Sequence, residues 1–245
     1  MTLTVTSLWR HPIKAHGREE VSEVTLVPGQ SMPGDRLWAV AHEAAKLDGT
    51  NWVRCTNFTR AAGSPKLMAI TCKTEAHQLR LSHPDLDDLL FDPNADQAAF
   101  LEWVMPLMPE GRAKPVKLIE ASEQGFTDSS WPSLTLCNQA SHKAVEAQLD
   151  QDLSIHRWRG NIWLDGLEAW AEFDWLGRDL RLGEAVINVR ERTERCMATT
   201  ANPDTGTRDA DTLGALQSFG HKDFSVKVAV IQGGLVRVGD TLDLV

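Results

Sequence analysis

The segment from Arg190 to Arg208 holds the residues best suited to chemistry. Cys196 directly follows Arg195, and the two come after a strand-like apolar run over 185–190. A thiol among guanidinium groups at a strand end favours an accessible, stabilised thiolate. The other interpretation is a buried structural cysteine, because free cysteine is among the most buried residue types.

Two further cations lie at the ends of strand-like runs near the N-terminus. Pro12 cannot lie within a ladder, so the first strand ends there and Lys14 projects from the next turn. A lysine held there can bind a phosphate as a point charge, or it is an ordinary surface lysine. Arg36 follows the turn signal Pro33-Gly34 and is expected to pair with Asp35 or with an incoming anion.

Two polar segments add hydrogen-bond donors. Arg157, Arg159 and Asn161 alternate along a run that we interpret as a strand, so they should share one face. Two guanidinium groups and an amide there would suit a planar or phosphorylated ligand, or they are solvated surface groups. The run Asp128-Ser129-Ser130 offers short donors for a phosphate or a polar heterocycle, although such residues also form ordinary turns and caps.

The overall composition limits the possible functions. The formal net charge is −9, which argues against non-specific nucleic-acid binding, yet arginines cluster in one third of the chain. Such clustering in an acidic protein suggests a pocket for a small anion, or else salt-bridged surface arginines. The four cysteines form no CxxC pair, which argues against a zinc ribbon, an iron–sulfur cluster and a disulfide framework.

The elements that must position these residues are mostly short strands with Gly and Pro between them. This pattern predicts a mainly β fold of barrels or sandwiches with few helices. Strands are expected at 2–9, 21–27, 37–41, 67–74, 78–82, 114–120, 162–164, 179–181, 184–190, 226–231 and 241–245, and helices at 95–105, 141–148 and 211–217. The run from Gly233 to Val245 suits the last hairpin of a barrel. The polar stretch 120–128 predicts two domains, residues 1–122 and 123–245.

Taken together, these segments resemble one family. The chain resembles MOSC-domain proteins with an N-terminal MOSC β-barrel domain, and among them the amidoxime-reducing component family that binds molybdenum cofactor. The resemblance extends over essentially the whole chain. It rests on five motifs in the same order, which are His11-Pro-Ile-Lys-Ala15, Gly34–Trp38, Arg157–Ile162, Arg195-Cys196 through Thr200, and Asn202–Gly206.

The resemblance implies specific roles and a β-barrel MOSC fold beside a smaller N-terminal β-barrel. Cys196 would be the sole protein ligand of molybdenum, completing the cofactor's own dithiolene and oxo ligands, with Arg195 beside the metal as a second catalytic residue. The remaining site residues would bind the Mo-pyranopterin through its phosphate or ring, and these are Lys14, Arg36, Asp128, Ser129, Ser130, Arg159, Asn161 and Thr193.

Three features depart from the family pattern. Ala15 replaces a serine after the lysine, which removes one hydroxyl donor. Gly160 replaces a proline between Arg159 and Asn161, which is expected to leave that strand more flexible. The chain also has no tyrosine, so the aromatic hydroxyl that some relatives present near 219–224 is absent.

The implied function is a molybdenum-cofactor-dependent oxidoreductase that reduces amidoximes, hydroxylamines or N-hydroxylated bases. The sequence shows no flavin, haem or cluster site, so a ferredoxin-, flavin- or cytochrome-type protein is expected to supply the electrons. The alternative is a sulfur carrier or cofactor-handling protein that carries a persulfide on Cys196. No apolar run is long enough to span a bilayer and the N-terminus lacks a signal-peptide pattern, so no membrane contact and a cytoplasmic location are expected.

Overall fold

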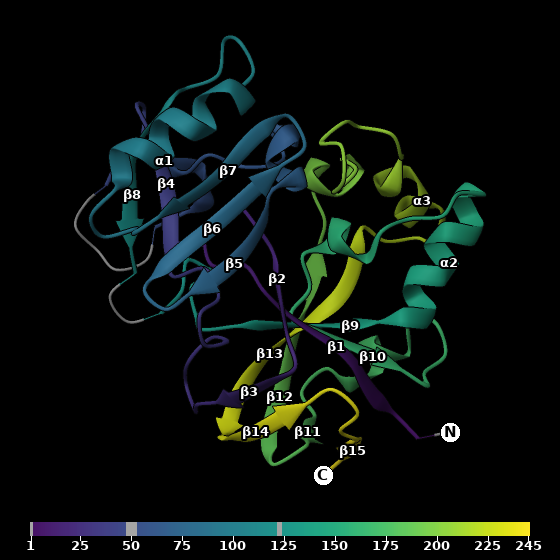
Figure 1. The fold of residues 1–245 in the computed structure, drawn as a ribbon. Coiled ribbons are helices and arrows are strands. Elements are labelled where there is room, and N and C mark those ends of the chain that lie inside the picture. The colour runs from purple at the N-terminus through teal and green to yellow at the C-terminus, as the bar shows by residue number, and fades with distance from the viewer. Residues whose placement is uncertain (1, 48–52, 122–123) are drawn as a thin grey trace.

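One large sheet dominates the protein, whose computed structural model describes residues 2–47, 53–121 and 124–245 (Figure 1). The expected mainly β fold with few helices is confirmed. The sheet has eight strands in the order β15-β11-β12-β13-β9-β10-β1-β2. Its strands are β1 (Thr4–Arg10), β2 (Glu19–Val21), β9 (Leu134–Asn138), β10 (Ile162–Asp165), β11 (Asp179–Leu182), β12 (Ala185–Glu194), β13 (Asp223–Gln232) and β15 (Leu242–Leu244).

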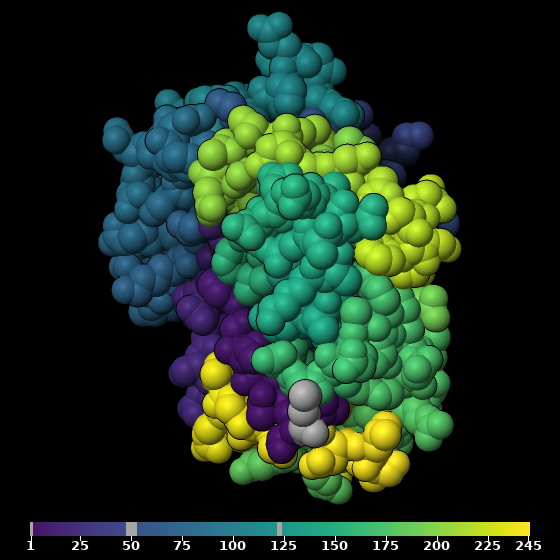
Figure 2. Space-filling view, turned by 90° about the vertical axis from the view of Figure 1, so that its right-hand side faces the viewer, coloured from purple at the N-terminus to yellow at the C-terminus, as the bar shows by residue number. Residues whose placement is uncertain are grey.

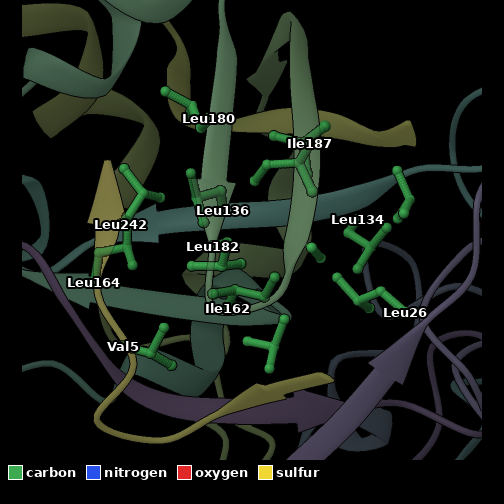
Figure 3. Close-up of a cluster of buried hydrophobic side chains, with 14 of the residues drawn as sticks. Val5, Leu26, Leu134, Leu136, Ile162, Leu164, Leu180, Leu182, Ile187 and Leu242 are labelled. Carbon is green, nitrogen blue, oxygen red and sulfur yellow. The ribbon is translucent and has the colours of Figure 1, made fainter. Parts of the chain in front are cut away.

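The large sheet closes into a barrel because β1 meets the segment that leads into β15. Thr4 and Thr241 form an antiparallel bridge, and the Val5 N–H donates to the Asp240 carbonyl over 2.9 Å. Apolar side chains from all sides fill the interior (Figure 3), among them Val5, Leu136, Ile162, Leu180, Ile187 and Leu242. Along β11 the buried Leu180 and Leu182 alternate with Asp179 and Arg181, as the wall of a filled barrel requires.

The N-terminal strands are built into the C-terminal half. Strand β1 belongs to the large sheet. Strand β3 (Glu23–Leu26) pairs with β14 (Gly234–Arg237). Two predictions are therefore corrected. The strand expected over 21–27 is divided at Ser22 into β2 and β3, and β14 and β15 do not pair with each other. Instead β14 satisfies the backbone groups of β3, and β15 pairs with β11 on the barrel wall.

The rest of the N-terminal half packs around its own apolar cluster, which contains Ile13, Val40, Leu81 and Phe100. The hairpin predicted between 67–74 and 78–82 exists, but residues 67–69 belong to a 3₁₀ helix that begins at Pro65. The elements here are β4 (Trp38–His42) paired with β8 (Pro115–Glu120), the sheet of β5 (Thr71–Glu75), β6 (Gln78–His83) and β7 (Leu86–Phe91), the helix α1 (Gln97–Val104), and the 3₁₀ helices η1 (Cys55–Asn57), η2 (Pro65–Ala69) and η3 (Met105–Leu107).

Two helices cover one side of the barrel, the side that faces the viewer in Figure 2. They are α2 (Gln139–Leu149) and α3 (Thr212–Ser218), accompanied by the 3₁₀ helices η4 (Ile155–Trp158), η5 (Ala171–Trp175) and η6 (Met197–Thr200). Asn138 caps α2, accepting from the Ala140 N–H over 2.9 Å. None of the described helices is both long and apolar enough to cross a membrane. The predicted domain boundary falls at residues 122 and 123, outside the described residues, and stays a prediction.

Candidate functional site

A cavity of about 310 Å³ lies where the N-terminal half meets one end of the barrel. Its wall combines segments that are far apart in sequence. It contains seven of the residues predicted to be catalytic or to bind the cofactor. These seven are Lys14, Arg36, Asp128, Arg159, Thr193, Arg195 and Cys196. Both halves of the chain therefore contribute to one pocket, which we call the main pocket.

Cys196 is exposed on the wall of the main pocket. It stands in extended conformation at the start of η6, and its carbonyl accepts from the Thr199 hydroxyl over 3.1 Å. Two of the other cysteines, Cys72 and Cys137, are buried, and burial raises the pKa of each thiol to about 12. The accessible-thiol interpretation therefore fits Cys196, and the structural-cysteine interpretation fits Cys72 and Cys137.

Arg195 uses its guanidinium mainly to fasten the site together. Nη1 donates to the Trp158 carbonyl over 2.8 Å, and Nη2 donates to the Phe224 carbonyl over 2.8 Å and to the Ser225 hydroxyl over 2.6 Å. The guanidinium also lies over the stacked rings of Trp158 and Phe224. These contacts tie the end of β12 to β13 and η4, so they hold the neighbouring Cys196 in place.

Lys14 and Asp128 form an ion pair across the main pocket. The Lys14 ammonium is buried, and it donates to Asp128 over 2.6 Å and to the Phe126 carbonyl over 2.8 Å. Desolvation at the pocket wall opposes ionisation of Asp128, but the Lys14 ammonium outweighs it and lowers the pKa of Asp128 to about 2. The pair joins the turn after β1 to the loop before β9.

Arg36 pairs with a fully buried acid beneath the pocket. Its guanidinium bonds to the Asp35 carboxylate, which also accepts from the His11 backbone N–H over 2.7 Å. Burial opposes ionisation of Asp35, but Arg36 outweighs it and holds the pKa of that carboxyl well below its usual range. Arg36 also donates to the Arg159 carbonyl over 3.3 Å and lines the main pocket. It therefore satisfies the expected pairing with Asp35 while remaining available to a ligand.

The expectation that Arg157 and Arg159 share a strand face is wrong. Residues 155–158 form η4, which Ser154 caps, and Arg159 ends it in the left-handed region at φ 48°. The intervening Trp158 explains the turn, because its ring is fully buried against Phe224 with centroids 3.8 Å apart. Both arginines nevertheless line the main pocket. Arg157 is held by Asp209 over 2.5 Å, and Arg159 donates to the Gly17 carbonyl over 3.3 Å.

Three polar atoms of the pocket residues are buried with no hydrogen-bond partner in the described structure. They are Arg157 Nε, Arg159 Nη2 and Thr193 Oγ1. Burial, with Arg36 nearby, lowers the pKa of Arg159 to about 9, so the side chain stays protonated at neutral pH. Leaving such donors unsatisfied costs about 1–3 kcal/mol each. An anionic ligand with several acceptor oxygens would remove that cost.

Three of the predicted site residues do not reach the pocket wall. Asn161 is fully buried, and its amide binds the Thr135 N–H over 3.0 Å and the Trp9 carbonyl over 3.1 Å. Ser129 is also buried and donates to Glu191 over 3.1 Å, while Ser130 is an exposed loop residue outside the pocket lining. Asn161 and Ser129 bind neighbouring protein groups and Ser130 faces solvent, and the contacts predicted between these three residues and a cofactor stay predictions.

Gly160 has a steric role that its sequence context does not reveal. A Cβ atom at this position would lie 2.3 Å from the Cys137 sulfur. The glycine is therefore required by the buried thiol beside it. This contact explains the presence of glycine at position 160 without the greater backbone flexibility that the sequence suggested.

The pocket also contains residues that sequence reasoning missed. Cys55 and Arg60 reach it from the N-terminal half, and Thr135, Thr199 and Lys227 from the barrel side. No periodic pattern or motif marks the segment around Cys55. Arg208, which lies outside the pocket lining, was missed as well, and it donates to the Ala62 carbonyl over 2.7 Å and to the Thr200 hydroxyl over 2.5 Å. It therefore joins the turn after Cys196 to the N-terminal wall.

The comparisons with known proteins agree with this architecture. Residues 2–113 match the MOSC N-terminal β-barrel domain, and residues 132–243 match the MOSC domain. The chain is 24% identical to mitochondrial amidoxime-reducing component 1 of Mus musculus, over 98% of this chain and 82% of that protein, and 22% identical to the Homo sapiens protein over the same shares.

Two further matches cover different extents. The Xenopus laevis amidoxime-reducing component 1 is 34% identical over 55% of this chain, but the match spans 42% of that protein. The crystal structure of the YUAD protein from Bacillus subtilis has a TM-score of 0.50 and 11% identity, covers 99% of this chain and 94% of its own, and supports the fold alone. Because the two domain models together account for nearly the whole chain, the protein is a MOSC-domain protein with an N-terminal MOSC β-barrel domain.

Proposed function

We propose that this protein is a molybdenum-cofactor-dependent oxidoreductase that reduces N-hydroxylated compounds such as amidoximes, hydroxylamines or N-hydroxylated bases. One observation carries the proposal. An exposed thiol, Cys196, shares a pocket with buried cationic and hydroxyl donors that lack partners. The names of the amidoxime-reducing relatives support the same reaction class.

The residues of the main pocket fit an anionic molybdenum cofactor. Cys196 would supply the protein's thiolate ligand, a soft donor suited to this metal. Lys14, Arg36 and Arg159 would bind the phosphate and the polar edge of the pterin. The Thr193 hydroxyl would donate one of the hydrogen bonds that it lacks in the described structure. Arg195 would act as a positioning residue, because most of its donors already bind protein acceptors.

When bound, the cofactor supplies the two-electron chemistry that breaks the N–O bond, while the protein supplies binding and electrostatics. The overall reduction replaces N–OH by N–H and releases water, so it consumes two electrons and two protons. An external ferredoxin-, flavin- or cytochrome-type protein would supply the electrons. The pocket is open at Cys196, so the substrate and the protons can reach it from solvent.

Metal analysis of protein from a host that makes the cofactor tests this proposal. We expect near-stoichiometric molybdenum in the wild type and nearly complete loss in Cys196→Ser. Cys55→Ser is the matched control, because it removes another thiol from the same pocket and should retain the metal. Full molybdenum loading without amidoxime turnover, across several electron-donor proteins, would contradict the reductase assignment.

The exposure of Cys196 also suits a second candidate, a sulfur carrier that holds a persulfide on this thiol. Mass spectrometry separates the two. A persulfide on Cys196 in metal-free protein supports the carrier, whereas bound molybdenum with an unmodified thiol supports the reductase. A cytoplasmic location is part of the proposal and can be checked by fractionation of the native host.

A further inference from the structure

A second, smaller hollow of about 90 Å³ adjoins the main pocket on the N-terminal side. It holds roughly three water molecules by volume, which is also the scale of one phosphate or carboxylate group. Its wall carries two guanidinium groups and an imidazole, those of Arg60, Arg112 and His42. Arg60 lines both the hollow and the main pocket, so a group held in the hollow lies beside whatever occupies the pocket.

The backbone of Gly63 places the Arg112 guanidinium against the hollow. A Cβ atom added at Gly63 would lie 3.0 Å from Arg112 Cζ and 3.2 Å from Nη2, so the planar group rests directly on the glycine. Neither Arg112 nor Arg60 has a carboxylate partner within the described ranges 2–47, 53–121 and 124–245. The Arg60 side chain makes only a weak contact in the described structure, in which Nη1 lies 3.8 Å from the Cys55 sulfur.

His42 borders the same hollow with its imidazole. Its Nε2 lies 2.8 Å from the Thr56 carbonyl, which can only accept, so Nε2 carries the hydrogen. Its Nδ1 is buried with no hydrogen-bond partner in the described structure. With the hydrogen on Nε2, Nδ1 can only accept a hydrogen bond and does not hold an anion. The donors at the hollow are the guanidinium groups of Arg60 and Arg112, two cations without carboxylate partners in the described structure, and together they suit an anion.

We propose that Arg60 and Arg112 form an anion subsite that binds a phosphate or carboxylate group carried by the substrate. The preferred substrates are then N-hydroxylated compounds with such a group, rather than neutral ones. This proposal rests on the proposed reductase function for the reaction itself. The subsite's affinity for an anion does not depend on that reaction.

Steady-state kinetics of the molybdenum-loaded protein test the substrate preference. The probes are benzamidoxime and its para-carboxylate derivative, which share the reacting group and differ in charge. In Arg112→Gln we expect kcat/KM for the carboxylate compound to fall about tenfold, since a charge-assisted contact is lost, mainly through KM. The value for benzamidoxime should stay within about twofold. Equal effects on both compounds, or no effect on either, would overturn the subsite.

Calorimetric titration with inorganic phosphate tests the site without any turnover. The wild type should bind phosphate, and Arg112→Gln should bind it at least about tenfold more weakly. Gly63→Ala keeps the charge but displaces the guanidinium, so it should weaken binding as well. Arg178→Gln removes an exposed arginine that lines neither cavity and should change nothing. Phosphate binding that is the same in all four proteins contradicts the subsite, even if no amidoxime is ever reduced.

Discussion

Thr193 is suited to binding a ligand, but its side chain lowers the stability of the cofactor-free protein. Its hydroxyl is buried on the pocket wall with no partner in the described structure. A valine has the same shape and suits the β12 strand, but it has no polar atom to satisfy.

We therefore predict opposite effects of Thr193→Val on stability and on cofactor retention. The free energy of unfolding of the cofactor-free protein should stay the same or rise by about 1 kcal/mol, because an unsatisfied donor is removed. Molybdenum retention during dialysis should fall several-fold. Chemical denaturation and metal analysis measure the two quantities. A variant that loses stability but keeps its metal would show that Thr193 is a structural residue.

At this scale the sequence predicted residue types better than side-chain directions. The clustering of arginines in an acidic chain indicated a pocket for an anion, and the thiol next to Arg195 indicated an accessible thiolate. The metal was implied by the family resemblance. Asn161 and Ser129 lie off the pocket wall, and nothing in their local sequence shows that backbone groups and Glu191 bind them in the described structure.

At the scale of elements, strands and helices with clear periodicity were predictable and tightly coiled segments were not. The three α-helices and most barrel strands lie where the hydrophobic pattern put them, whereas β7 and β9 were missed. The segment around Arg159 was assigned to a strand because Arg-Trp-Arg alternates. The ring of Trp158 and the left-handed backbone of Arg159 make it a turn instead.

The contact between Gly160 and Cys137 can be tested as a coupled pair between that turn and β9. Gly160→Ala should lower the free energy of unfolding by about 1–3 kcal/mol, because the new methyl group overlaps the sulfur. Adding Cys137→Ala should recover much of that loss, since it removes the sulfur. Denaturant titration of the two single variants and the double variant gives the coupling energy. Additive effects would show that the two positions do not compete for space.

At the scale of the whole molecule, the chain returns to its own beginning to complete the site. β1 closes the barrel made by the second half, and the turns after it carry His11, Lys14 and His16 to the junction between the halves. Such long-range pairing could not be read from local patterns. The family resemblance implied two β-barrel domains, but not that the first strand belongs to the second barrel.

The buried histidines at this junction should make the protein sensitive to acid. Burial, followed by the charge of Arg159, lowers the pKa of His11 to about 3. Burial outweighs the bond from the ring to the Lys14 carbonyl and lowers the pKa of His16 to about 4. Below the ordinary value of 6.5 the unfolded chain binds protons that the folded chain excludes. Stability therefore falls as pH drops from about 6.5 towards 4, by up to about 1.4 kcal/mol per pH unit for each histidine.

Thermal unfolding between pH 7.5 and 5 measures this effect, and the melting temperature should be flat near pH 7.5 and fall below about 6.5. His16→Gln should reduce the slope, although it lowers stability at neutral pH by removing a buried ring. His77→Gln is the control, because that side chain is 75% exposed and should leave the slope unchanged. Carboxylates such as Asp35 become protonated, and then destabilise the fold, only at lower pH. Comparing His16→Gln with the wild type therefore identifies the cause of the slope more directly than the shape of the pH curve does. A slope that is unchanged in His16→Gln would mean that other groups cause the acid sensitivity of the junction.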